Sequence, residues 1–176
     1  MRKYIFLALL LAAPAFAQDQ ATDLRAAAGC GPAETKFNVK KEKKQHSASQ
    51  PEAGKALVYV FEEYRSDPHY QTLGHVTTRV GLDGNWVGAN QESSYFTFAV
   101  EPGSHRLCSD VQSVFAHNLS AAAGLVAEPG RTYYYRVIVK DDEPREEPQL
   151  RLNVIDEAEG LLLASKFARS TSKAKK

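Results

Sequence analysis

The feature that most constrains the fold of this chain is a succession of short apolar runs separated by turn signals. The strongest run spans residues 132–140, where three tyrosines are followed by Arg136 and a Val-Ile-Val stretch. Residues of these types favour strands. Further strands are expected at residues 55–64, 76–80, 95–100, 105–111 and 150–155, the last at a sheet edge. Residues 57–61 are continuously apolar, which suits a strand buried on both faces.

The connections between these runs carry the residues that tight turns require. An Asp-Gly pair at residues 83–84 is a hairpin signal, and Pro-Gly pairs at residues 102–103 and 129–130 mark two further turns. No helical unit separates the strands. The sequence therefore predicts a mainly β protein, a small antiparallel β-sandwich of about seven strands with a short C-terminal helix and an extended N-terminal arm.

Two segments fit this pattern less directly. Residues 118–127 are rich in alanine and could form either a helical turn or a strand. Near the C-terminus, residues 161–167 place three leucines and a phenylalanine near helical spacing, which predicts a short helix. We expect a frayed basic tail at residues 170–176 after this helix.

The N-terminus has the pattern of a bacterial signal peptide. Two basic residues precede an apolar run at residues 4–11, and Ala15-Phe16-Ala17 offers small residues where a signal peptidase reads them. We therefore expect cleavage after Ala17 and export to the periplasm or the medium. No apolar run approaches the roughly 20 residues that cross a bilayer, so no transmembrane segment is expected.

The alternative localisation is attachment to a membrane through a lipid on Cys30, because residues 27–30 loosely match a lipoprotein cleavage box. Such a box should close the apolar run directly, whereas residues 18–25 insert charged side chains, so we do not expect this anchor. The expected organisation is a signal peptide (1–17), a polar lysine-rich arm (18–53), a β-sandwich (54–156), and a short helix with a basic tail (157–176).

The charge balance argues against a nucleic-acid binder. The chain carries 22 basic and 21 acidic side chains, and loss of the signal peptide would remove two of the basic ones. Nucleic-acid-binding domains usually concentrate a large positive excess. A local excess occurs in the arm, at Lys36, Lys40, Lys41, Lys43 and Lys44. It is typical of a solvated arm, with an anionic surface or polymer as the alternative.

Cys30 and Cys108 form an even pair in a chain with an export signal, which favours a structural disulfide. Closing a loop of roughly 80 residues would stabilise the fold by roughly 4 kcal/mol and tie the arm onto the sandwich. Reactive thiols are disfavoured, because the chain has no Cys-x-x-Cys motif.

Five motifs follow one another between residues 54 and 156. They are an apolar strand at 54–61, Gly-Leu-Asp-Gly-Asn-Trp-Val-Gly at 81–88, Tyr-Phe at 95–96, Val-Glu-Pro-Gly-Ser-His at 100–105 and Pro-Gly-Arg-Thr-Tyr-Tyr-Tyr at 129–135. This order resembles a domain-of-unknown-function family of bacterial exported proteins and lipoproteins, and it is similar to the PEGA-like envelope sandwiches. The resemblance implies a small β-sandwich at the cell envelope and supplies no catalytic residues.

Few residues are candidates for chemistry. The chain has no nucleophile-elbow, phosphate-loop or His-Glu-x-x-His motif, and its five histidines do not occur at metal-ligand spacings. We therefore expect no catalytic residue, metal or cofactor. His105 should pack beside the hairpin and bond a backbone carbonyl. Trp86, Tyr95 and Phe96 could form a carbohydrate-stacking platform, although Trp86 could instead cap the core.

These observations lead to two functional hypotheses from different classes. The first is a non-enzymatic envelope accessory protein, a disulfide-tied sandwich that presents loops or an edge strand to another envelope protein. The alternative is a cell-wall glycan-binding module that uses the three aromatic residues. A hydrolase is disfavoured, because the motifs do not assemble a nucleophile, a base and an orienting group.

Overall fold

The structure, a computed structural model, describes residues 30–42, 49–66, 76–91, 93–112, 119–141 and 147–175. The expected signal peptide lies outside these ranges. The described elements are β1 (Phe37–Lys41), β2 (Ala56–Ser66), β3 (Thr77–Leu82), β4 (Asn85–Gln91), β5 (Ser94–Val100), β6 (Gly103–Val111), β7 (Ser120–Ala127), β8 (Thr132–Asp141), β9 (Gln149–Ile155), α2 (Glu157–Lys166) and β10 (Ala168–Ala174). No helix in these ranges is long and apolar enough to cross a membrane.

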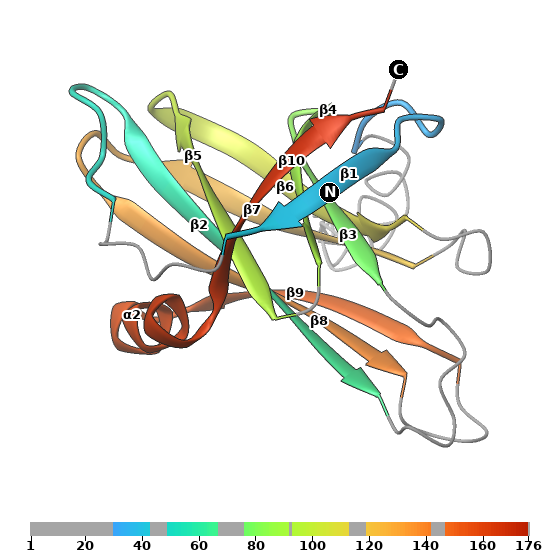
Figure 1. Ribbon diagram of the computed structural model, residues 1–176. Coiled ribbons are helices and arrows are strands. Elements are labelled where there is room, and N and C mark those ends of the chain that lie inside the picture. Colours follow the sequence, from blue (N-terminus) through green and yellow to red (C-terminus); the bar gives the residue numbers. More distant parts are fainter. Residues whose placement is uncertain are drawn as a thin grey trace, which may run out of the picture.

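Two sheets form the body of the molecule (Figure 1). The six-stranded sheet has the order β1-β10-β5-β2-β8-β9, and the four-stranded sheet has the order β4-β3-β6-β7. The expected fold class, a mainly β sandwich with a short C-terminal helix, is confirmed. Most neighbours are antiparallel, but β2 runs parallel to β8, and β10 runs parallel to β5. The Asp-Gly hairpin is also present, with positive φ angles at Asp83 and Gly84 between β3 and β4.

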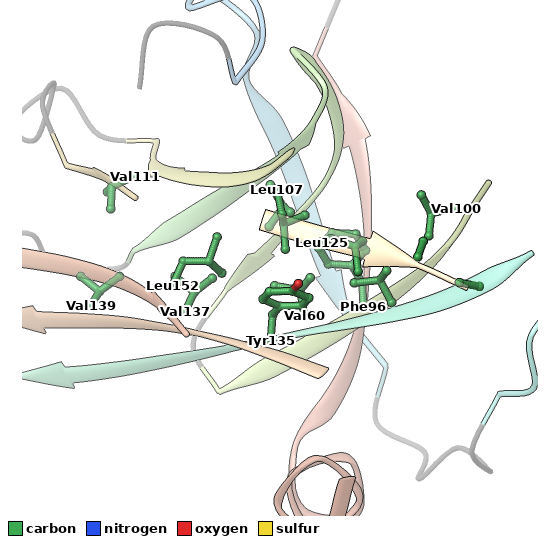
Figure 2. Packing of buried hydrophobic residues seen from close by; sticks show 14 of the residues in the cluster. Val60, Phe96, Val100, Leu107, Val111, Leu125, Tyr135, Val137, Val139 and Leu152 are labelled. Atoms are coloured by element: carbon green, nitrogen blue, oxygen red, sulfur yellow. The ribbon is translucent and has the colours of Figure 1, made fainter. Parts of the chain in front are cut away.

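The main core lies between the two sheets (Figure 2). Alternate residues of β2, among them Val58 and Val60, point into it and are fully buried. The other residues that line it from the six-stranded sheet are Phe96, Val100, Tyr135, Val137, Val139 and Leu152, and those from the four-stranded sheet include Val80, Leu107, Val111 and Leu125.

A second apolar cluster lies on the outer face of the six-stranded sheet. Leu57, Tyr59 and Phe61 point into it from β2, and Phe167 packs against it just after α2. Both faces of β2 are therefore buried, as the continuous apolar run predicted. The helix begins where the Asp156 side chain accepts a hydrogen bond from the Glu159 N–H at 2.8 Å.

Two segments differ from, or go beyond, the expectations. The alanine-rich segment, for which the sequence allowed either a helical turn or a strand, forms the strand β7. The expectation of a frayed C-terminal tail was wrong, because Ala168–Ala174 forms β10, which pairs with β1 and β5. Backbone pairing and hydroxyl contacts hold this polar strand, and its Ser170 hydroxyl donates to Asn90 Oδ1 at 2.6 Å. Its sequence has no apolar alternation from which a strand could be predicted.

The contact between α2 and the sheet leaves no room for a side chain at Gly160. A Cβ atom there would lie 2.3 Å from Tyr134 Cδ1, although alanine usually stabilises a helix relative to glycine. We expect Gly160→Ala to lower the free energy of unfolding by about 1–3 kcal/mol through overpacking. Gly124→Ala is the matched control, since a Cβ atom at Gly124 meets nothing within 4 Å. Denaturant unfolding of both variants checks this, and a Gly160→Ala protein as stable as wild type would contradict the packing.

Candidate interaction surface

The N-terminal segment, residues 30–36, crosses the outer face of the four-stranded sheet. Cys30 is joined to Cys108 of β6, with their Cα atoms 5.7 Å apart, and both side chains are buried. Gly81 of the neighbouring strand β3 makes this approach possible, because a Cβ atom there would lie 2.2 Å from the Cys30 carbonyl oxygen. The disulfide therefore fixes the start of the segment directly on the sheet.

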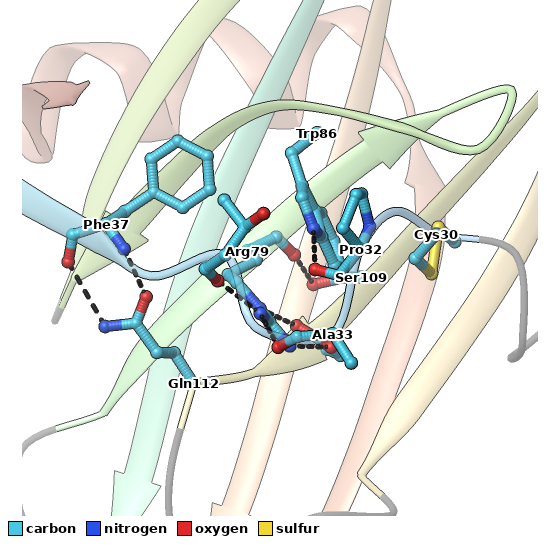
Figure 3. Close-up of polar contacts among 11 residues, drawn as sticks. Cys30, Pro32, Ala33, Phe37, Arg79, Trp86, Ser109 and Gln112 are labelled. Carbon is cyan, nitrogen blue, oxygen red and sulfur yellow. Dashed lines mark hydrogen bonds and ion pairs between the residues drawn. A yellow bond between two sulfur atoms is a disulfide. The ribbon is translucent and has the colours of Figure 1, made fainter. Parts of the chain in front are cut away.

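Arg79 holds the next part of the segment (Figure 3). This arginine of β3 is only 7% exposed and lies opposite Asp110 of β6. Its Nε donates to Asp110 Oδ1 at 2.7 Å, and its Nη2 donates to the second carboxylate oxygen. Its Nη1 donates to the carbonyl oxygens of Ala33 and Thr35. The buried guanidinium thus joins two strands to the segment that covers them.

Trp86 and Gln112 complete the attachment, which we call the N-terminal clasp and define as Cys30–Cys108, Arg79–Asp110, Trp86 and Gln112. The Trp86 ring lies 4.4 Å from the Arg79 guanidinium carbon, and its Nε1 donates to the Pro32 carbonyl oxygen at 2.9 Å. The Gln112 amide accepts from the Phe37 N–H and donates to the Phe37 carbonyl oxygen. Phe37 begins β1, so the clasp sets the start of that strand.

The three aromatic residues expected to bind a ligand do not share a surface. Trp86 lies on the outer face of the four-stranded sheet, beneath Gly31 and Pro32. Tyr95 and Phe96 are both buried, the first in the outer cluster of the six-stranded sheet and the second in the main core. Consecutive residues of a strand point to opposite faces. A single aromatic platform is therefore not formed.

His105 ties the two turns at one end of the sandwich together, and it bonds a backbone carbonyl as expected. Its Nδ1 lies 2.7 Å from Asp83 Oδ2, and its Nε2 lies 2.8 Å from the Glu101 carbonyl oxygen. Two acceptors therefore face one ring, which favours the doubly protonated imidazolium. The hydrogen bond to Asp83 raises the pKa of His105, and the same bond lowers the pKa of Asp83.

The edge strands of the two sheets are protected to different degrees. β1 carries Lys40 and Lys41, and β9 carries Arg151. β4 lies against β10, and its Ala89 N–H donates to the Ser172 hydroxyl at 3.0 Å. Charged side chains and covering segments are common means by which proteins protect sheet edges.

β7 differs from the other three edges. It is eight residues long, contains neither a charged residue nor a proline, and pairs only with β6. The Val111 N–H donates to the Leu119 carbonyl oxygen, so every second residue from Leu119 onwards bonds to β6. The backbone groups of Ser120, Ala122, Gly124 and Val126 consequently point away from β6, toward the outer edge of the sheet beside β9; of these groups, the Gly124 carbonyl oxygen already accepts from a side chain of β8.

Apolar side chains are exposed beside this edge. Val126 of β7 and Val154 of β9 are 69% and 66% exposed, more than any other large hydrophobic residue in the described ranges. Tyr135 connects the two strands, because it pairs with Val154 and its hydroxyl donates to the Gly124 carbonyl oxygen at 2.8 Å. We call these four residues the β7–β9 margin. It combines strand backbone with two exposed valine side chains, and the buried Tyr135 connects them.

The sequence predicted the disulfide of the clasp, but it predicted neither the other contacts of the clasp nor the β7–β9 margin. Arg79 and Asp110 meet only through the β3–β6 register, which has no signal in the sequence.

Within the described ranges, no group of three His, Cys, Asp or Glu side chains could hold a metal ion. A scan of family models and searches of curated proteins and solved structures give no match.

The His105–Asp83 contact predicts a pH-dependent stability. A raised pKa means that the contribution of His105 is fully present below its ordinary value of 6.5 and is lost as the pH rises through the folded value. The lowered pKa of Asp83 means that its contribution is lost only as the pH falls below about 3.8. The advantage of wild type over His105→Gln in unfolding free energy should therefore be largest below pH 6.5 and shrink as the pH rises above this value.

The difference in unfolding free energy between wild type and His105→Gln is expected to stay below about 1 kcal/mol, because Asp83 is half exposed. NMR titration of the His105 ring gives the direct measurement. We expect a pKa above 6.5 that returns toward this value in Asp83→Asn, since asparagine tolerates the positive φ at this position. A wild-type pKa of 6.5 or lower would contradict the bonding scheme.

Proposed function

We propose that this chain is a non-enzymatic binding module of the bacterial cell envelope, and that it docks an extended segment of another envelope protein on the free edge of β7. The observation that carries the proposal is the state of this edge: an uncharged strand whose outward backbone groups lie beside exposed Val126. Strand addition uses main-chain hydrogen bonds for affinity and side-chain contacts for selectivity.

The placement in the envelope is supported by sequence and structure together. The N-terminal residues have the pattern of a signal peptide, and a disulfide is the crosslink of oxidising compartments. The motif order that resembles PEGA-like envelope sandwiches supports membership in such a group. We place the mature protein in the periplasm or the medium, and we propose no lipid on Cys30, whose sulfur is bonded to Cys108.

A binding role also agrees with the use of the described polar side chains. Arg79 and Asp110 hold the N-terminal segment, and His105 holds two turns. Ser109 donates to the Arg79 carbonyl oxygen inside the sandwich. Each of these groups is engaged in a structural contact. We do not propose a glycan-binding module, because Trp86, Tyr95 and Phe96 lie on three different surfaces.

The proposal predicts that a charge on the β7 edge abolishes partner binding. We expect Val126→Lys to reduce capture of the envelope partner at least tenfold, because a lysine on an edge strand opposes the addition of another strand. Leu162→Lys on α2 is the matched control, since Leu162 is also exposed, at 51%. Affinity capture from an envelope extract of the native host, quantified by mass spectrometry, compares the two variants with wild type.

A second variant tests the contribution of the backbone hydrogen bonds of β7 apart from that of its side chains. Ala122→Pro removes one N–H that points away from β6, so it should leave the β6–β7 ladder intact and still abolish capture. The proposal would be contradicted by partners that remain bound equally to all four proteins. Turnover of any substrate in a panel of esters, peptides and glycosides would contradict its non-enzymatic part.

A further inference from the structure

Two lysine-containing segments from opposite ends of the chain meet in one ribbon. β1 and β10 pair antiparallel, with Asn38 opposite Lys173 and Lys40 opposite Thr171. The pairing extends one residue further, since the Lys175 N–H donates to the Lys36 carbonyl oxygen at 2.7 Å. Phe37 and Ser170, with the opposite parity, are buried toward the sandwich. The outward face of the ribbon therefore consists of Lys36, Asn38, Lys40, Thr171, Lys173 and Lys175, all exposed.

Four of these six positions are lysines, and we call them the lysine quartet: Lys36, Lys40, Lys173 and Lys175. Lys36 and Lys175 lie directly opposite each other, and Lys173 is diagonal to Lys40. Like charges directly opposite in a sheet are destabilising. Among the residues that the structure describes, no carboxylate lies within the 4.0 Å of an ion pair from any of the four. The ribbon therefore concentrates positive charge that the fold itself does not neutralise.

We propose that the lysine quartet is a docking surface for an anionic phospholipid bilayer. Charge complementarity is the basis of this assignment: exposed lysines near an anionic membrane surface are attracted within about one Debye length. The near neutrality of the whole chain means that the attraction is local to this ribbon. It would orient the protein with β1 and β10 toward the lipid.

The arrangement of the quartet favours a surface of headgroups over other anionic ligands. The four lysines are spread along two strands: Lys173 and Lys175 stand about 7 Å apart along β10, Lys36 and Lys40 about 13 Å apart along β1, and Lys36 and Lys175 about 5 Å apart across the ribbon. Such a spread does not converge on one phosphate. Asn38 and Thr171 fill the remaining positions, so the face offers no aromatic ring on which a nucleic-acid base could stack. Lysine also provides point charges rather than the planar fork of arginine.

Co-sedimentation with vesicles tests the proposal. The probes are vesicles of phosphatidylglycerol and phosphatidylcholine in equal parts, and vesicles of phosphatidylcholine alone. We expect wild type to bind only the first kind at low ionic strength and to be released at about 0.5 M salt, where screening is strong. Replacing all four lysines by glutamine should weaken binding at least about a hundredfold, since each lysine is expected to contribute about a fivefold factor.

The control variant removes the same charge elsewhere. It replaces the exposed residues Arg106, Arg131, Arg151 and Lys166 by glutamine, and it should bind like wild type. Thermal unfolding shows whether each variant is folded, and the quartet variant should melt no lower than wild type because it loses a like-charge contact.

Three results would overturn the proposal. They are an absence of binding to the anionic vesicles, an equal loss of binding in the control variant, and quartet-dependent binding of heparin without binding to vesicles. The last result would assign the ribbon to a soluble polyanion instead.

Discussion

The buried guanidinium of Arg79 holds the middle of the N-terminal segment on the four-stranded sheet. Arg79 pairs with Asp110 and also binds the carbonyl oxygens of Ala33 and Thr35, while Trp86 covers one face of the group. A buried charge is tolerated only when its donors are matched, so the segment and the sheet need each other. The disulfide fixes one end of this segment, and Gln112 fixes the other at Phe37.

This clasp determines which surfaces the sandwich presents. By placing β1, it gives β10 a partner, and the two strands close one side of the sandwich against β4. On the opposite side, β7 lies beside β9, and no strand of the described residues is hydrogen-bonded to its outer edge. The lysine quartet and the β7–β9 margin therefore lie at opposite ends of the two strand orders. A protein held on a membrane by one side would still offer the other to a partner.

The sequence predicted the interior of the fold better than its surfaces. Continuous apolar residues in β2, the Asp-Gly hairpin and the terminal leucines were sufficient for the strands and the helix, because burial imposes a composition on them. β10 was missed because backbone pairing holds it, and pairing leaves no apolar pattern. The expected aromatic platform is not formed, because Tyr95 and Phe96 are adjacent in sequence and therefore point to opposite faces of β5. Arg79 and Asp110 depend on strand register, which local patterns do not contain.

Hydrogen exchange of an Arg79→Met variant with its disulfide intact would test the clasp most directly. If the guanidinium holds the N-terminal segment, the amides of β1 should lose at least about tenfold of their protection, while those of β2 and β8 keep theirs. Full protection of β1 in this variant would contradict the account. A uniform loss across all strands would do so as well, because it would show that Arg79 supports the whole sandwich rather than the segment.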